Sequence, residues 1–225
     1  MLVSKNIIYI NFNIIDYNYS IYIQDYLFNK ILFISLFNKY INKISINNYI
    51  IFCQHNSVYT VGRNFNSTLV NNIVYSNLNI PFYKINRGGS ITYHGLGQLI
   101  IYPVLNLLNF FKDINLYLRL LEQLIILILK DLNINAIRLK KFTGVWVYNN
   151  YIKKICSIGI RVSRWITMHG LALNINNNLN YFNNIISCGL KNKYLTTVCI
   201  ESDKNISISF FIKFFKKYLL DVFLN

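Results

Sequence analysis

The sequence predicts a single α/β domain in which helices flank a mixed β-sheet. Three stretches have the apolar spacing of amphipathic helices, and several short apolar stretches between them are typical of strands. Neither an internal repeat nor a linker divides the 225 residues, and one hydrophobic core can serve a chain of that length. We therefore expect residues 1–225 to fold as one domain.

The first helix is predicted from Asp16 to about Lys43. Apolar residues recur there at steps of three and four, and we interpret the stripe as core packing. The stripe consists of Tyr22, Tyr26, Ile31, Ile34 and Phe37. A buried strand, Tyr49–Cys53, is predicted next. A turn follows that contains His55, which we interpret as a structural histidine.

The stretch Arg87–Pro103, RGGSITYHGLGQLIIYP, concentrates glycine together with arginine and histidine. Strands predicted at Phe82–Ile85 and Leu99–Leu105 enter and leave it. Because glycine permits positive φ and the close approach of another molecule, we expect a ligand-facing loop held between two strands.

A long amphipathic helix is predicted next, with Asp113 as its N-cap and Leu132 as its end. Its apolar face comprises Leu116, Leu120, Leu124 and Leu127 or Ile128. A last helix is predicted at Ser207–Phe223, with Phe211, Phe214 or Phe215, Tyr218 and Val222 as its packing residues.

Four strands are predicted between these two helices, at Ile134–Leu139, Gly144–Tyr148, Lys154–Val162 and Ile166–Ile175. The last of them alternates between apolar and small or polar residues, which indicates a half-buried sheet. A polar, irregular stretch, 176–194, follows and contains Cys188.

The chain is strongly basic, with 23 lysines and arginines against 8 acidic residues and a formal charge of +15. Such a field favours acidic partners. The basic residues are scattered, so we expect no nucleic-acid binding and attribute the charge to A+T-rich drift or to an acidic protein partner. The longest aliphatic run, Leu124–Leu129, is far short of the ~20 residues that span a membrane. With no secretory signal, we expect a soluble, cytoplasmic monomer, and an organelle remains an alternative.

Four cysteines share no C-x-x-C spacing, so we expect reduced thiols and no metal site. Four segments combine glycine with reactive side chains, and they supply Arg87, His94, Lys154, His169 and Cys188. A thiol with a pKa of about 8.5 needs a neighbouring cation or base to act as a nucleophile.

Among the thiols, Cys188 precedes a glycine in the polar stretch and is the better candidate nucleophile. Cys156 fits an inert strand residue. Lys153 and Lys154 point to opposite faces of a strand, and spacing alone does not decide which faces a site.

Five motifs, in this order, resemble those of the lipoyl(octanoyl) transferase family: RGGSITYHGLGQLIIYPVLNL, GVWV, KKICSIGIRV, TMHGLALNIN and SCGL. The resemblance extends from about His55 to the last motif. It departs from the family at Leu96 and Ser187, where the family has prolines that fix φ.

The resemblance implies a fold similar to the catalytic domains of biotin and lipoate ligases. It implies transfer of an octanoyl group from the phosphopantetheine thioester of acyl carrier protein to a lysine on lipoyl domains of oxoacid dehydrogenases or the glycine-cleavage H protein. It assigns the nucleophile to Cys188 and the lowering of its pKa to Lys154, with no cofactor beyond the donor's own arm. It assigns substrate binding to Arg87, Gly88, Gly89, Ser90, Ile91, Thr92, Tyr93, His94, Ser157, Ile158, Gly159, Gly170, Leu171 and Ala172. His169, which precedes Gly170, is a candidate for support of the site or equally a core residue.

Three alternatives stay open from the sequence. An ATP-dependent lipoate or biotin ligase would share the fold but needs no nucleophilic cysteine. A basic nucleic-acid-binding module would explain the charge, and a degenerate family member would keep only the fold.

Overall fold

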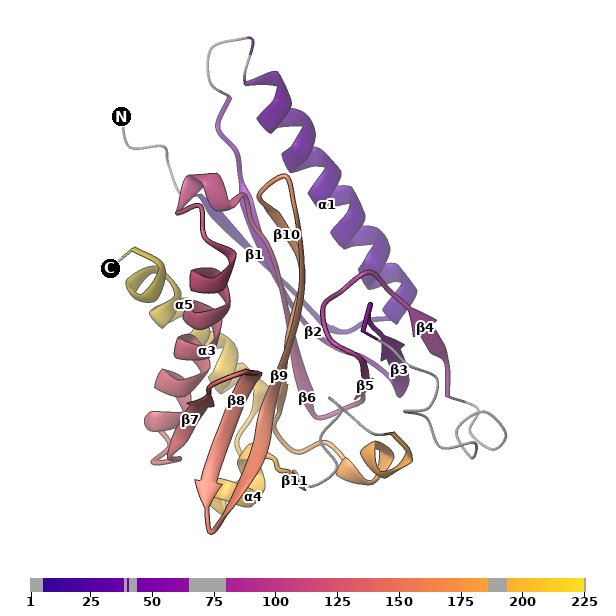
Figure 1. The fold of residues 1–225 in the computed structure, drawn as a ribbon, viewed down its shortest axis with the longest axis vertical. Coiled ribbons are helices and arrows are strands. Elements are labelled where there is room, and N and C mark those ends of the chain that lie inside the picture. The colour runs from indigo at the N-terminus through magenta and orange to yellow at the C-terminus, as the bar shows by residue number, and fades with distance from the viewer. Residues whose placement is uncertain (1–5, 39, 41–43, 65–79, 186–193, 225) are drawn as a thin grey trace.

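The structure, a computed structural model, describes residues 6–38, 40, 44–64, 80–185 and 194–224 (Figure 1). Its main element is an eight-stranded sheet in the order β1-β2-β6-β10-β9-β8-β7, with β11 paired to β9. The strands are β1 (Ile7–Ile14), β2 (Asn48–Gln54), β6 (Gln98–Val104), β7 (Ala136–Leu139), β8 (Phe142–Asn149), β9 (Tyr151–Ser163), β10 (Ile166–Asn174) and β11 (Tyr194–Leu195). Parallel pairs, β1 with β2 and β11 with β9, join antiparallel ones, so the predicted mixed sheet is confirmed.

A second, three-stranded sheet has the order β4-β3-β5. It consists of β3 (Val58–Val61), β4 (Phe82–Lys84) and β5 (Ile91–His94). Strand β5 lies inside the stretch that the sequence predicted as a loop, and it pairs with β3 from the preceding predicted turn. Both strands are short, but they are rich in Val, Ile, Thr and Tyr, which are favoured in strands, and they pair with each other.

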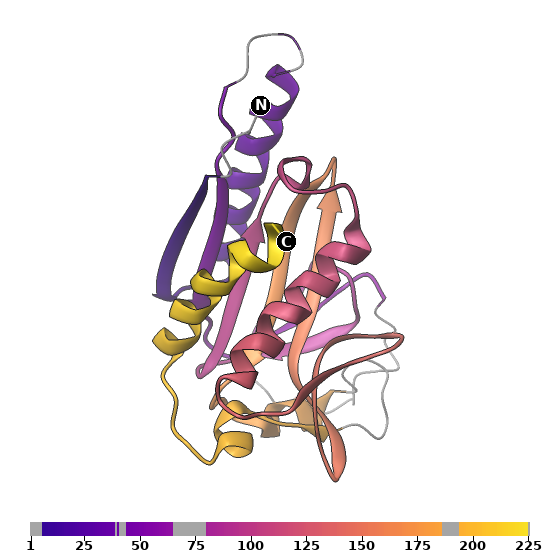
Figure 2. The same cartoon turned by 90° about the vertical axis from the view of Figure 1, so that its left-hand side faces the viewer.

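Helices cover both faces of the large sheet (Figures 1 and 2). The helices are α1 (Tyr17–Phe37), α3 (Ile114–Lys130), α4 (Val198–Ser202) and α5 (Ile208–Leu224), with 3₁₀ turns η2 (Leu107–Asn109) and η3 (Leu179–Asn184). Ile50 and Phe52 of β2 pack in the core under α3 and α5, whereas Tyr49, Ile51 and Cys53 face the core under α1. This alternation places a hydrophobic layer on each side of the strand.

Strand β10 is buried along its whole length, whereas the sequence predicted half burial. Leu171 and Leu173 join the core with α3 and α5, and Ala172 joins the core with α1. Ala172 of the second face is therefore covered by α1, and Asn174 is buried in hydrogen bonds with Gln98 and Thr196.

The first helix begins as predicted, with the Asp16 carboxylate accepting a hydrogen bond from the Tyr19 amide at 3.0 Å. Its predicted core stripe is wrong at three positions, because Tyr22, Tyr26 and Phe37 are 66%, 58% and 39% exposed. The buried face consists of Tyr17, Ser20, Gln24, Leu27, Phe28 and Ile31. Apolar residues surround this helix, so their spacing alone selects the wrong face.

The N-cap of α3 is confirmed, since the Asp113 carboxylate accepts from the Leu116 amide at 2.9 Å. Leu116 is exposed, and the buried face of this helix consists of Tyr117, Leu121, Glu122, Leu124, Ile125, Ile128 and Leu129. In α5 the fully buried aromatic residues are Phe211 and Phe215. Within the described residues, no helix is both long enough and apolar enough to cross a membrane.

Candidate functional site

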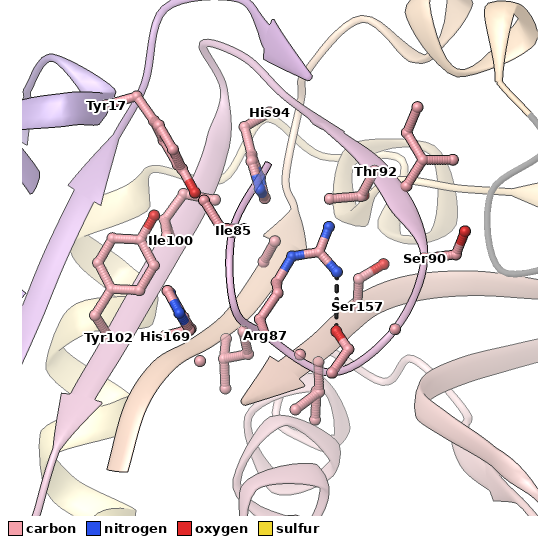
Figure 3. Close-up of a pocket in the computed structure, with 18 of the residues that line it drawn as sticks. Tyr17, Ile85, Arg87, Ser90, Thr92, His94, Ile100, Tyr102, Ser157 and His169 are labelled. Atoms are coloured by element: carbon pink, nitrogen blue, oxygen red, sulfur yellow. Dashed lines mark hydrogen bonds between the residues drawn. The ribbon is translucent and has the colours of Figure 1, made fainter. Parts of the chain in front are cut away.

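A cavity of about 570 Å³, which includes its open mouth, lies between the two sheets at the end of α1. Strands β9 and β10 and the segment 85–94 supply most of its wall. In Figure 3, Tyr17, Tyr102 and His94 gather toward one end of the cavity and Ser90, Thr92 and Ser157 toward the other, with Arg87 between them. Strands β9 and β10 are neighbours in the sequence, the segment 85–94 is far from both, and all three meet at one site.

The sequence-predicted residues on this cavity wall come from all three segments. They are Arg87, Gly88, Gly89, Ser90, Ile91, Thr92, His94, Lys154, Ser157, Ile158, Gly159, His169, Gly170, Leu171 and Ala172. Cys188 lies outside the described residues, as does Ser187. Tyr93 is absent from the lining. Its ring stacks on Tyr181 at 4.7 Å between centroids, and its hydroxyl lies 2.8 Å from that of Ser57.

Arg87 fixes the glycine segment to the small sheet. Its guanidinium donates to the Thr60 carbonyl at 2.9 Å and the Thr60 hydroxyl at 3.0 Å. The next amide, of Gly88, donates to the Ile160 carbonyl of β9 at 2.9 Å. The segment is therefore held by both sheets, and a buried positive charge stands at the cavity wall.

His94 enters the cavity as a neutral ring. Burial lowers its pKa to about 3, and the nearby charge of His55 acts in the same direction. The side-chain oxygen of Gln98, Oε1, lies 2.8 Å from His94 Nδ1, while the side-chain nitrogen of Gln98 donates to Asn174 Oδ1 at 2.8 Å. This chain of hydrogen bonds assigns the Nδ1 proton to His94 and orients the ring.

His169 has left-handed backbone geometry, with φ of 59°, in the middle of a strand. Its amide donates to the Gln24 side-chain oxygen of α1 at 2.9 Å. At the next residue, a Cβ on Gly170 would stand 2.1 Å from the Ile101 carbonyl oxygen, so only glycine fits against β6. Burial, followed by the charge of Arg87, lowers the pKa of His169 to about 4.

The structure separates the two adjacent lysines. Lys154 is 6% exposed and lines the cavity, and its Nζ lies 5.0 Å from the centroid of the Trp146 ring. Lys153 instead pairs with Glu201 at 2.8 Å. Lys154 is therefore the lysine that a ligand in the cavity would meet.

Gly144 makes room for Lys154 across the β8–β9 pair. Its φ is 121°, and a Cβ there would stand 2.7 Å from Lys154 Cε. The Gly144 amide donates to Glu122 Oε1 at 2.9 Å, and Glu122 is fully buried on α3 and paired with Arg119 at 2.6 Å. A helix carboxylate thus fixes the irregular backbone beside the lysine.

Sequence reasoning missed the cavity residues Tyr17, Ile85, Ile100 and Tyr102. Alternation along β6 could have placed Ile100 and Tyr102 on one face, but nothing in the sequence says that α1 brings Tyr17 to them. His55 has the structural role that was predicted, because its ring lies 2.9 Å from the Ile15 carbonyl and 2.8 Å from the Tyr102 hydroxyl. Cys156 is fully buried, and burial raises the pKa of its thiol.

The fold is shared with lipoylating and biotinylating enzymes. A bi-partite lipoate protein ligase from Thermoplasma acidophilum superposes with a TM-score of 0.68 over 95% of this chain and 84% of that one, at 14% identity. A biotin protein ligase from Aquifex aeolicus superposes with a TM-score of 0.53 over 98% of this chain and 71% of that one, at 12% identity. The expected ligase-like fold is confirmed.

Residues 16–220 match the family described as the lipoyl protein ligase A/B catalytic domain, and the chain belongs to this family. Proteins named octanoyltransferase are similar to it over most of their length. The one from Flavobacterium psychrophilum is 46% identical over 83% of this chain and 82% of its own, and the one from Cytophaga hutchinsonii is 40% identical over 96% and 91%.

Proposed function

We propose that this protein transfers an octanoyl group from a carrier-bound thioester to a lysine of a lipoyl domain, as the names of its relatives suggest. One observation carries the proposal. The three segments that the transferase resemblance assigned to substrate binding line a single cavity, with Lys154 in its wall. We propose acyl carrier protein as the donor, and lipoyl domains of oxoacid dehydrogenases and the glycine-cleavage H protein as acceptors.

In the first half-reaction, the Cys188 thiolate attacks the carbonyl carbon of the octanoyl thioester. A new carbon–sulfur bond to Cys188 forms, and the bond to the donor's arm breaks. The leaving sulfur takes a proton from the Lys154 ammonium and departs as a thiol. The buried position of Lys154 supports this role, because a charge removed from water interacts strongly with a neighbouring thiolate.

In the second half-reaction, a neutral lysine amine of the acceptor attacks the acyl-enzyme. A carbon–nitrogen bond forms, the Cys188 thiolate leaves, and the surplus proton of the amine returns to Lys154. The ion pair is thereby restored, and the exchange of a thioester for an amide drives the cycle forward.

The far end of the cavity suits the hydrocarbon tail. Ile85, Ile100 and Leu171 supply apolar surface, and Tyr17 and Tyr102 supply ring faces. Each buried methylene contributes ~0.8 kcal/mol, so a tail of fitting length is bound more tightly than a shorter one. The neutral rings of His94 and His169 add no charge that would oppose an apolar tail.

Mass spectrometry of the protein after incubation with an octanoyl thioester tests the proposal. We expect an added octanoyl mass, which is lost when an acceptor lipoyl domain is supplied and absent in Cys188→Ala. An undiminished adduct in Cys188→Ala would contradict the assignment. Because related folds belong to ligases, acceptor labelling is also measured with and without ATP. If labelling required ATP and free octanoate, the protein would be a ligase and not a transferase.

A further inference from the structure

A second cavity, of about 1010 Å³ including its open mouth, adjoins the first. The two share six wall residues, namely Gly88, Gly89, Ser90, Lys154, Ile158 and Gly159. The two spaces therefore meet at Lys154. If a reacting group lies beside this lysine, a chain attached to it on one side can extend into the first cavity and a chain on the other side into the second.

The second cavity extends outward along β8. Exposure increases from Trp146, which is buried, through the half-buried Thr143 and Phe142 to Lys141, which is exposed in the turn between β7 and β8. Five residue steps of extended chain cover about 16 Å. The cavity thus has an inner end at Lys154 and Trp146 and an outer end at Lys141.

The walls of the second cavity differ from those of the first. The wall combines apolar surface from Leu118, Phe142 and Ile160 with the polar groups of Asn64 and Thr143. Such a mixture suits a ligand in which short methylene runs alternate with amides, because each amide needs a hydrogen-bonding partner when it leaves water. The ammonium of Lys141 at the outer end suits an anionic group.

We propose that the second cavity binds the phosphopantetheine arm of the acyl donor, with the phosphate at Lys141 and the thioester sulfur beside Lys154. This inference rests on the proposed transferase function. The cationic side chain of an acceptor lysine is the less suitable occupant, because Lys141 at the outer end would repel it.

Calorimetric titration with two small molecules, phosphopantetheine and pantetheine, tests the inference without turnover. The unmodified protein should bind phosphopantetheine more tightly than pantetheine. In Lys141→Glu the ratio of the two affinities should fall on the order of fivefold or more, since a favourable charge pair becomes a repulsive one. The matched control is Lys140→Glu, which makes the same change of charge at a neighbour that does not line the cavity. The Lys140→Glu variant should keep the preference for phosphopantetheine over pantetheine.

Equal losses in the Lys141 and Lys140 variants would overturn the inference, because they would indicate only long-range attraction. A Lys141→Glu variant that binds both molecules as the unmodified protein does would overturn it as well. A Lys141→Glu variant with an altered KM for the acceptor domain and an unaltered KM for the donor would also overturn the inference. The octanoyl mass shift of the unmodified protein is read separately, so a failure of the transferase function is distinguishable from a failure of this site.

Discussion

At the scale of single residues, the neighbours Lys153 and Lys154 differ most sharply in environment. One pairs with Glu201, and the other lies in the cavity wall against Trp146. In the proposed cycle Lys154 gives a proton in one half-reaction and takes one in the other, so its removal affects both.

Lys154→Met keeps an unbranched stem against Trp146 and removes the ammonium. We expect the rate of acceptor octanoylation to fall by roughly 10²–10⁴-fold, as is usual when a group that transfers protons is lost. Single-turnover assays of each half-reaction measure the effect. Lys153→Met is the matched control and should retain most of the rate, with a small loss of stability from its ion pair. Equal losses of rate in the two variants would show that Lys154 has no specific role in the reaction.

The three histidines of the chain are all buried, and burial lowers the pKa of each. The folded protein therefore binds fewer protons than the unfolded chain once the pH falls below the unfolded value near 6.5. These rings make their full contribution to stability above that pH. The contribution is lost as the pH falls toward the pKa values of the folded protein, about 4 for His169 and about 3 for His94.

Denaturant titrations between pH 7 and pH 5 should show this loss, with a limiting slope of about 1.4 kcal/mol per pH unit for each ring. His94→Gln removes one titrating ring and keeps a group that can hydrogen-bond Gln98, so its stability should vary less with pH. An unchanged slope in this variant would show that His94 does not contribute.

At the scale of elements, the irregular backbone at Gly144 links α3 to the site. Glu122 of α3 accepts the Gly144 amide proton, and Gly144 in turn leaves space for the Lys154 stem. A buried carboxylate with two arginine partners thus fixes the backbone that leaves room for Lys154.

Gly144→Ala should displace Lys154 and lower kcat on the order of tenfold or more with little change in KM, since the cavity for the acyl tail is untouched. Steady-state kinetics with thermal melts measure this. Gly97→Ala is the control, because Gly97 also has positive φ, at 84°, and does not contact Lys154. Both variants should lose stability, and a similar loss of kcat in Gly97→Ala would show that strain alone is responsible.

The elements also show what the sequence could predict. Long helices with capping residues and the strands from β6 to β10 were found because cap chemistry and local spacing determine them. Strands β1, β3 and β5 were missed, because four to eight residues of a chain this rich in Ile, Asn and Tyr become strands through pairing. The buried face of α1 was misassigned for a related reason. Tyr22 and Tyr26 fit the apolar spacing of a helix, but their side chains are exposed to solvent.

At the scale of the whole molecule, the candidate site depends on topology. Central strands β9 and β10 contribute Lys154 and His169, and the small sheet covers them with the Arg87 segment. Motif resemblance assigned these residues to one reaction. Periodicity could not bring them together, because segments 87–94 and 157–172 are far apart in the sequence. They meet through the pairing of β6 with β10 and the hydrogen bond from Gly88 to Ile160.

The net charge of +15 is also a property of the whole molecule. The salt dependence of kcat/KM shows whether this charge attracts the donor. If the donor is an acidic carrier protein, the field should attract it, and kcat/KM for octanoyl carrier protein should fall steeply between 50 mM and 500 mM salt. The control is an uncharged octanoyl thioester of N-acetylcysteamine, whose kcat/KM should vary little over that range because no long-range attraction acts on it. Parallel salt titrations of the two donors make the measurement. If the carrier-bound donor proved as insensitive to salt as the small one, compositional drift would suffice to explain the charge.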